Sequence, residues 1–310
     1  MPELPDIEDY RAALQARLVG NVVAKVRVTS FALLRTFDPP VDALHGQVVT
    51  EIRRMGKRLV FVFGDHVDAD GAAEPLFAVL HLMIAGRLRW EAYGAKVPGR
   101  IGMAAFDVTA PDATPVGTLI LTEAGTKRRA SLHVVREDDL GDHDRGGLEV
   151  LDASRDEFAA AITTTNRTLK RGLTDPTILS GIGNAYSDEI LHAAELSPVA
   201  RTQQLDDDEL TRLYEATVAM LTQWTQRLRD ETGDGFPGKV TAFRDDFATH
   251  GKFGEPCPVC GTSIARISYA DKETNYCPGC QTGGRLLKDR SLSRLLKDDW
   301  PATIDEAEAG

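Results

Sequence analysis

The sequence has few cysteines, few aromatic residues and no long apolar run. Four cysteines in 310 residues are too few for a disulfide-stabilised scaffold. Phe, Trp and Tyr together make up 6% of the chain. The apolar runs fall short of the roughly 18 to 20 residues of a membrane helix, so we expect neither a spanning protein nor a membrane partner. The acidic N-terminus lacks the basic and apolar regions of a signal peptide, which predicts a cytoplasmic protein.

The chain also lacks an excess of basic residues, because 47 acidic residues stand against 36 basic ones. This balance argues against a non-specific nucleic-acid binder. The basic residues nevertheless fall in local clusters, each of which would ordinarily be a solvated face. Three clusters in one chain favour a single phosphate-binding surface. They are Arg53, Arg54, Lys57 and Arg58; Lys127, Arg128 and Arg129; and Arg167, Lys170 and Arg171.

The first half of the chain predicts one helix followed by strands. Asp6 is a candidate N-cap for a helix whose apolar residues recur at helical spacing up to Gly20. Short apolar segments separated by Gly, Pro and Asp then favour a β-sandwich or barrel over residues 20–136. The expected strands are residues 22–28, 59–63, 76–80, 101–108 and 118–122. Residues 138–147 are polar, contain glycine and have no periodicity, so we expect a linker there.

In the second half the apolar period changes to that of helices. Ser154 and Glu157 form a capping box before a helix expected to end near Arg171. A glycine-containing turn at 181–184 precedes a second helix over 185–196, and a longer helix follows over about 208–229.

All four cysteines lie in two Cys-x-x-Cys pairs separated by 16 residues. This spacing predicts one structural zinc held by Cys257, Cys260, Cys277 and Cys280. Proline or glycine adjoins each pair, as a tight turn that presents two sulfurs requires. Four thiolates leave no open coordination position, so this zinc would have no part in the chemistry. A redox pair is the alternative interpretation of the same residues.

The N-terminus offers a candidate nucleophile. Removal of Met1 would leave Pro2 with a secondary amine beside the carboxylate of Glu3. An α-amino group titrates near 8 and is neutral in roughly a tenth of molecules at pH 7, against well under a thousandth for lysine. Attack on a sugar C1′ would form a cationic iminium, which acidifies the neighbouring C2′ proton. By itself, Pro-Glu at an N-terminus is more commonly a disordered start.

Three motifs together resemble the formamidopyrimidine-DNA glycosylase and endonuclease VIII family. They occur in the family's order and extend the resemblance over about residues 1–285. The motifs are Met1-Pro-Glu-Leu-Pro5, Gly181-Ile-Gly-Asn184-Ala-Tyr-Ser-Asp-Glu189, and the two cysteine pairs with their flanking residues. The fold implied is α+β and two-lobed: an N-terminal β-sandwich with flanking helices, a helix–two-turn–helix domain and a C-terminal zinc finger.

The resemblance also implies roles for individual residues. Pro2 would be the Schiff-base nucleophile and Glu3 the general acid and base. Lys57 would contact a backbone phosphate and assist β-elimination. Asn184, at a helix start, would bind phosphate together with backbone N–H groups. The basic residues Arg128, Arg129 and Lys170 would also contact DNA.

Two regions depart from the family pattern. Lys272 stands where the family's finger hairpin has an arginine; it keeps the charge but loses the bidentate geometry, so we expect a phosphate contact and a role in elimination. Ile84 stands at the position of a methionine that fills the space left by an everted base. Arg128 fits the family arginine, but Ala130 replaces the phenylalanine that follows it. A preference for 8-oxoguanine opposite cytosine is therefore not implied, and the chain resembles a divergent branch of the family.

The sequence thus predicts a monomeric, bifunctional DNA glycosylase and AP lyase of base-excision repair, found in the cytoplasm and at the nucleoid. Its partner would be double-stranded DNA with damaged, chiefly oxidised bases or abasic sites. The expected segments are a catalytic β-sandwich at 1–136, a linker at 137–152, the helix–two-turn–helix domain at 153–243, the zinc finger at 244–285 and a tail at 286–310. Two alternatives stay open: a damaged-DNA-binding protein of this fold without efficient turnover, and a zinc-ribbon interaction protein.

Overall fold

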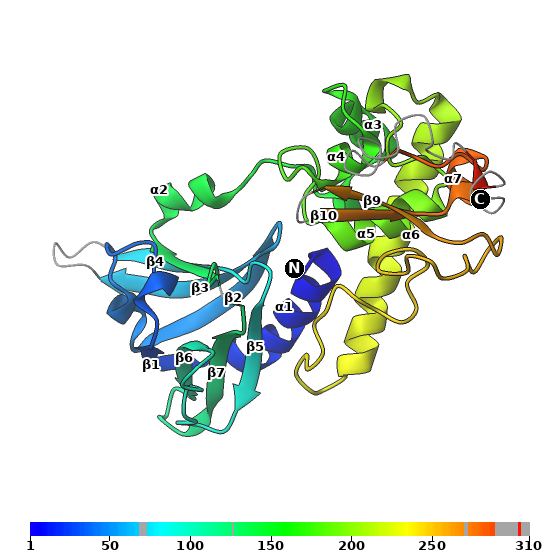
Figure 1. The fold of residues 1–310 in the computed structure, drawn as a ribbon. Helices are drawn as coiled ribbons and strands as arrows, with labels where there is room; N and C mark the ends of the chain where they lie inside the picture. The colour runs from blue at the N-terminus through cyan, green and yellow to red at the C-terminus, as the bar shows by residue number, and fades with distance from the viewer. Residues whose placement is uncertain (68–72, 126, 270–271, 289–302, 305–310) are drawn as a thin grey trace. The chain divides into compact units, whose positions relative to one another are not determined.

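The computed structural model describes residues 1–67, 73–125, 127–269, 272–288 and 303–304, without the side chains of 65–67, 73, 269 and 272. The chain divides into two compact units (Figure 1). Unit 1 comprises Met1–Arg145 and Trp224–Thr241, and unit 2 comprises Gly146–Gln223 and Ala242–Gly310. The helix α6 (Asp207–Thr232) contributes residues to both units. The segment boundaries expected from the sequence stay a prediction, and the units are described separately.

Unit 1 is built on eight antiparallel strands in the order β5-β7-β6-β1-β2-β3-β4-β8. The strands are β1 (Val22–Val28), β2 (Gln47–Met55), β3 (Arg58–Val67), β4 (Ala73–His81), β5 (Gly86–Glu91), β6 (Gly102–Thr109), β7 (Pro115–Glu123) and β8 (Ser131–Val135). The five expected strands are confirmed as parts of β1, β3, β4, β6 and β7. Short 3-10 helices lie at Phe31–Leu33 and Val41–Leu44.

Strand β2 has no counterpart among the expected strands, and its burial explains why. Val49 and Ile52 are its buried residues, and a break in register falls between Val49 and Glu51. The apolar positions therefore do not alternate regularly, and the segment carries charged residues on its exposed positions. The period-two signal that identifies a strand is lost at this irregularity.

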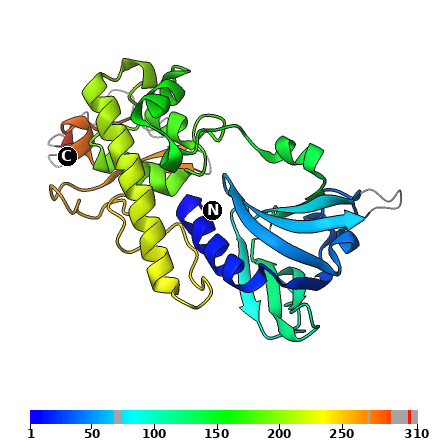
Figure 2. The same cartoon turned by 180° about the vertical axis from the view of Figure 1, so that it is seen from behind.

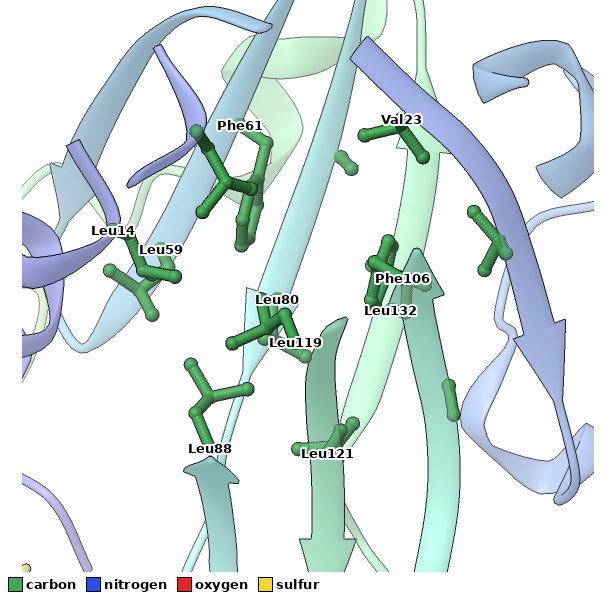
Figure 3. Packing of buried hydrophobic residues seen from close by; sticks show 14 of the residues in the cluster. Leu14, Val23, Leu59, Phe61, Leu80, Leu88, Phe106, Leu119, Leu121 and Leu132 are labelled. Atoms are coloured by element: carbon green, nitrogen blue, oxygen red, sulfur yellow. The ribbon is translucent and has the colours of Figure 1, made fainter. Parts of the chain in front are cut away.

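The core of unit 1 lies between the two halves of this strand arrangement, where apolar side chains from both halves meet (Figure 3). Phe61 from β3 and Phe106 from β6 stack with ring centroids 6.2 Å apart and planes inclined by 4°. Buried leucines surround them, including Leu59, Leu119 and Leu121. Because side chains of both halves interdigitate, the unit is a β-sandwich, as expected from the sequence.

Helix α1 (Leu4–Leu18) packs one apolar face into the same core. The helix begins earlier than expected, because Glu3 rather than Asp6 is the N-cap residue. Pro5 falls in the first turn, where a missing N–H costs no hydrogen bond. Asp6 instead accepts a hydrogen bond from the backbone N–H of Glu3 at 2.9 Å.

The outer face of β3, β4 and β8 carries a second, smaller apolar cluster, formed by Val60, Val62, Phe77, Val79 and Val135. Leu140 of the short helix α2 (Glu137–Leu140) packs against it. A 3-10 turn, Gly141–His143, follows. The segment expected to be a linker therefore begins with ordered turns, and Leu140 packs on the buried valines of this outer face.

Unit 2 is helical, with α3 (Arg155–Thr163), α4 (Leu169–Thr174), α5 (Asn184–Ala193) and the first part of α6. The capping box of Ser154 and Glu157 is confirmed. The single helix expected over 154–171 is wrong, since α3 ends at Thr163. There the hydroxyls of Thr163 and Thr164 donate to carbonyls four residues back at 2.6 and 2.8 Å, in a run of β-branched residues that favours a helix end. Further 3-10 turns are Val150–Asp152 and Thr202–Gln204.

The zinc-finger region of unit 2 is a hairpin of β9 (Ala265–Tyr269) and β10 (Lys272–Tyr276), followed by α7 (Pro278–Thr282). The hairpin and α5 both belong to unit 2 and lie side by side in the two views (Figures 1 and 2). Within the described ranges, no helix is long and apolar enough to cross a membrane.

The stacked pair in the sandwich core gives a test of its energetic weight. Phe106→Ala should lower the free energy of unfolding by about 3–5 kcal/mol, because it leaves a cavity between the two halves. Phe31, which is 79% exposed, provides the control, and Phe31→Ala should change the value by less than about 0.5 kcal/mol. Urea titration followed by circular dichroism measures both. Equal effects of the two substitutions would contradict the assigned core.

Candidate active site and zinc centre

The chain's first residues are held inside unit 1 rather than extending into solvent. Pro2 is buried and Glu3 is 3% exposed. The backbone N–H of Ile7 donates to the carbonyl of Glu3 at 3.0 Å, which closes the first turn of α1. Pro2 and Glu3 are therefore part of the folded unit, and the N-terminus is not a disordered start.

Charged groups of unit 1 surround this terminal amine. Burial lowers the pKa of the Met1 amine below its ordinary value, and the positive charges of Arg87 and Lys57 lower it further. The carboxylates of Glu3 and Asp6 oppose the shift. The structure thus brings together the amine end, Glu3 and Lys57, three groups that the sequence places up to 56 positions apart. Arg87, from β5, also acts on this amine through its charge, and no sequence pattern pointed to it.

Lys57 lies in the tight turn between β2 and β3, after Gly56 with a φ of +59°. Its neighbour Arg54 is engaged by Glu8 of α1 at 2.8 Å. Burial alone would raise the pKa of Glu8, but hydrogen bonds and charges from Arg11 and Arg54 outweigh it, so the pKa is lowered. Of the basic cluster at 53–58, Arg54 therefore has a structural ion pair, and Arg53 is paired with Glu51 at 2.7 Å.

Ile84 is presented by the turn between β4 and β5. It is 60% exposed, although it is a large apolar residue. Met83 before it has a φ of +54°, and its N–H donates to Nδ1 of His81 at 3.1 Å. The guanidinium of Arg87 donates to the carbonyl of Ile84 at 3.1 Å. Both contacts fix a strained turn whose tip is an exposed apolar side chain.

The loop before β8 contains exposed arginines followed directly by a buried alanine. Arg128 and Arg129 are exposed, and Arg128 donates to the carbonyl of Arg100. Ala130 is fully buried in the sandwich core. The buried carboxylate of Glu123 accepts hydrogen bonds from the N–H groups of Arg129 and Ala130 at 3.0 Å, which turns the chain inward at that point.

In unit 2, Asn184 and Lys170 are joined to each other. Asn184 is the first residue of α5, and its side-chain amide donates to the carbonyl of Glu273 in β10 at 2.8 Å. The ammonium of Lys170 donates to the carbonyl of Asn184 and to the carboxylate of Asp188, both at 2.6 Å. Both side chains thus have partners inside unit 2. Lys272 begins β10 and pairs with Tyr269, but its side chain lies outside the described part of the chain.

Two adjacent buried acids of α5 were not selected from the sequence. Asp188 binds Lys170 and the ring of His250, at 2.6 and 2.7 Å. Glu189 accepts hydrogen bonds from the N–H groups of residues 248–250 and from the hydroxyl of Thr249, at 2.7–2.9 Å. Acids at consecutive positions, directly before the apolar residues Ile190 and Leu191, were the available signal. They bind the segment that leads into the zinc finger.

The cysteines of the finger converge as a zinc site requires. Sγ of Cys260 lies 3.4 Å from that of Cys277, and Sγ of Cys257 lies 3.9 Å from that of Cys280. Sulfurs at 2.3 Å from a tetrahedral zinc would be about 3.8 Å apart. A Cβ at Gly279 would approach Sγ of Cys260 to 3.0 Å, so this glycine leaves the space that the sulfur occupies. The residues therefore fit one structural zinc.

His192 of α5 also lies at this site. Its Nε2 and the sulfurs of Cys257, Cys277 and Cys280 all lie within 4.8 Å of one another. No spacing in the sequence connects His192 to the cysteines, because it precedes Cys257 by 65 positions.

A sandwich unit with a buried start, joined in one chain to a helical unit with a zinc finger, is the architecture that the resemblance implies. Residues 1–131 match the formamidopyrimidine-DNA glycosylase N-terminal domain, and residues 149–231 match the H2TH domain of that glycosylase. Residues 254–283 match the zinc finger found in FPG and IleRS. The chain therefore belongs to the formamidopyrimidine-DNA glycosylase family, which confirms the resemblance.

Individual relatives support this membership. The chain is 30% identical to the formamidopyrimidine-DNA glycosylase of Listeria innocua, over 91% of this chain and 100% of that protein. It is 42% identical to an uncharacterized formamidopyrimidine-DNA glycosylase-like protein of Mycobacterium tuberculosis, over 49% of this chain and 94% of that one. Among solved structures, MutM in complex with DNA containing carbocyclic 8-oxo-G matches with a TM-score of 0.76 at 25% identity, covering 91% of this chain and 100% of that chain.

The environment of His81 predicts a pH dependence of unit 1. Burial, with the charges of Arg58 and Lys57, lowers the pKa of His81 to about 4. An unfolded histidine titrates near 6.5, so between about pH 6.5 and 4 the unfolded chain binds a proton that the folded chain does not. Stability from this group is complete above about pH 6.5 and is lost as the pH falls toward 4.

His81→Asn keeps an acceptor for the N–H of Met83 but does not titrate. Between pH 6.5 and 4, the variant's melting temperature should fall less steeply than that of the wild type. The difference corresponds to about one proton fewer taken up on unfolding. Thermal melts at half-unit pH steps measure this difference. Parallel curves for the two proteins would show that His81 is not responsible.

Proposed function

We propose that this protein is a bifunctional DNA glycosylase and AP lyase of base-excision repair, with Pro2 as the nucleophile once Met1 is removed. The observation that supports the proposal is the burial of Pro2 and Glu3 at the start of α1, where burial and the charges of Arg87 and Lys57 lower the pKa of the chain's amine end. Burial and nearby cations favour the neutral amine, which is the reactive form. An enclosed carboxylate at Glu3 is suited to proton transfer.

The proposed reaction begins with release of the base. The lone pair of the Pro2 nitrogen attacks C1′ of the deoxyribose, the bond from C1′ to the damaged base breaks, and the base leaves with a proton. The nitrogen then loses its proton, and the C1′–O4′ bond breaks as O4′ takes up a proton. The ring-opened cationic iminium that results draws electrons from C2′. A base then removes a C2′ proton, and the 3′-phosphate leaves by β-elimination. Glu3 serves in proton transfer, and Lys57 neutralises phosphate charge.

For DNA recognition we propose that each unit supplies its own contacts. In unit 1 these are Lys57, the exposed Arg128 and Arg129, and Ile84, whose exposed apolar side chain is suited to fill the space left by an everted base. In unit 2 they come from Lys272 and from the N-terminus of α5. Since Lys170 and the Asn184 amide are already hydrogen-bonded, we expect them to shape that turn as well as to meet phosphate.

The relatives support this substrate class. Solved structures of similar chains contain DNA with an abasic site or with carbocyclic 8-oxo-G. Ala130, at a position where the family has phenylalanine, is buried in the core and cannot enter a duplex. We therefore propose an opposite-base preference that differs from one set by an inserted aromatic residue.

Trapping the iminium tests the nucleophile. Borohydride should convert the intermediate on abasic duplex DNA into a stable protein–DNA adduct, and peptide mapping should locate it at Pro2. Protein that retains Met1 has an amide at Pro2 with no lone pair to donate, so trapping and strand cleavage should both fall to background. The matched control is the same preparation after enzymatic removal of Met1. Normal cleavage by Met1-bearing protein would place the nucleophile elsewhere.

Glu3→Gln tests the proton-transfer step separately. Excision of an intact damaged base should fall by about 10²-fold or more, the scale of general acid–base catalysis. Cleavage at a preformed abasic site should fall much less, since no base has to leave. Glu91→Gln, at an exposed position on β5, is the charge-matched control. A wild-type protein that binds lesions but turns over neither substrate would favour the binding-protein alternative.

A further inference from the structure

The last turn of α5 places a histidine against the zinc-binding cysteines. Nε2 of His192 lies 3.3 Å from Sγ of Cys257, and both residues are buried. The distance is that of an N–H···S hydrogen bond. His192 comes from the helix that follows the glycine turn, whereas all four cysteines come from the finger itself.

The chemistry of the site determines which atom donates. A zinc-bound cysteine is a thiolate, which accepts hydrogen bonds and donates none. The nitrogen of His192 that faces Cys257 must then carry the proton, so the ring is the Nε2–H tautomer. Residues that bind a metal are commonly oriented by hydrogen bonds from neighbours that do not themselves bind it.

Cys257 receives a second donor from its own turn. The backbone N–H of Val259 points to the same sulfur at 3.4 Å. Cys277 likewise receives the N–H of Cys280 at 3.4 Å, from within its own turn. The His192 contact differs from these because it joins the finger to another element of unit 2.

We propose that His192 is a positioning residue of the zinc centre, whose Nε2–H donates to the Cys257 thiolate and holds the zinc-loaded finger against the end of α5. A donated hydrogen bond withdraws electron density from the sulfur, which makes the thiolate less basic and less nucleophilic. Cys257 is thereby protected from alkylation and oxidation.

The contact also completes a set of bonds along α5. At the start of the helix, the Asn184 amide binds the carbonyl of Glu273, and just beyond its end the Gln281 amide donates to the carbonyl of Leu196 at 2.9 Å. The eight helical steps from Asn184 to His192 span about 12 Å of helix. The finger is thus held at both ends of the helix whose N-terminus is proposed to meet DNA.

Two substitutions of His192 separate the hydrogen bond from packing. His192→Leu fills similar space without a donor, and His192→Gln retains an N–H at a comparable reach. Zinc-loaded His192→Leu should react with iodoacetamide at Cys257 about 10-fold faster than wild type. This factor is at the lower end of the effects seen when a hydrogen-bond partner of a metal ligand is removed. His192→Gln should stay near the wild-type rate, and all three proteins should hold one zinc per chain. Peptide mapping by mass spectrometry gives the rate at each cysteine.

Equal Cys257 reactivity in the three proteins would overturn the proposal. So would a Cys260→Ser protein that keeps its zinc while His192→Leu loses it, because that pair of results would make His192 a ligand in place of Cys260. These measurements require no DNA, so their outcome is independent of the proposed glycosylase function.

A measurement on the wild-type protein serves if His192→Leu does not fold. In protein loaded with ¹¹³Cd and labelled with ¹⁵N-histidine, the Nε2–H proton of His192 should show scalar coupling to the metal through Sγ of Cys257. A proton found on Nδ1 instead, or a direct coupling of cadmium to the His192 nitrogen, would refute the donor role.

Discussion

Burial of one face of α1 in the sandwich core determines where the first residues of the chain lie, and so which chemistry they can carry out. Leu4, Ile7 and Leu14 have no exposed surface, so the helix cannot move outward without exposing them to water. Because the helix starts at the fourth residue, this packing also draws Pro2 and Glu3 into the protein. The lowered pKa of the terminal amine is a consequence, since burial penalises its charged form.

A corresponding constraint in unit 2 is the pair of buried acids on α5. A carboxylate excluded from water needs hydrogen-bond donors or a positive charge. Asp188 is paired with Lys170, and Glu189 accepts hydrogen bonds from residues 248–250. These bonds fix the chain just before the first zinc-binding cysteine. The zinc centre therefore depends on α5 as well as on its own sulfurs, and His192 extends that dependence to Cys257 itself.

Features that depend on short stretches of chain could be predicted from the sequence. The capping box of Ser154 and Glu157 needs a partner only three residues away, and it occurs as expected. Each cysteine pair was found by its local Cys-x-x-Cys spacing, and sulfurs of the two pairs meet as a shared zinc requires. Regular strands such as β1 and β7 were found by their apolar pattern. Strand β2 was not, because its register shift breaks the alternation, and the helix after Ser154 was drawn too long because threonine hydroxyls compete for its carbonyls.

By itself the sequence determined the family, the zinc-binding cysteines and the identity of the candidate nucleophile, because these rest on residue types at fixed spacing. Only the tertiary structure decided that the charge of Arg87 acts on the terminal amine, that Ala130 lies in the core and that Lys170 is paired with Asp188. Those facts depend on contacts between residues far apart in the chain. The packing of apolar faces determines which distant groups come into contact. The local spacing of residues in the sequence does not predict these contacts.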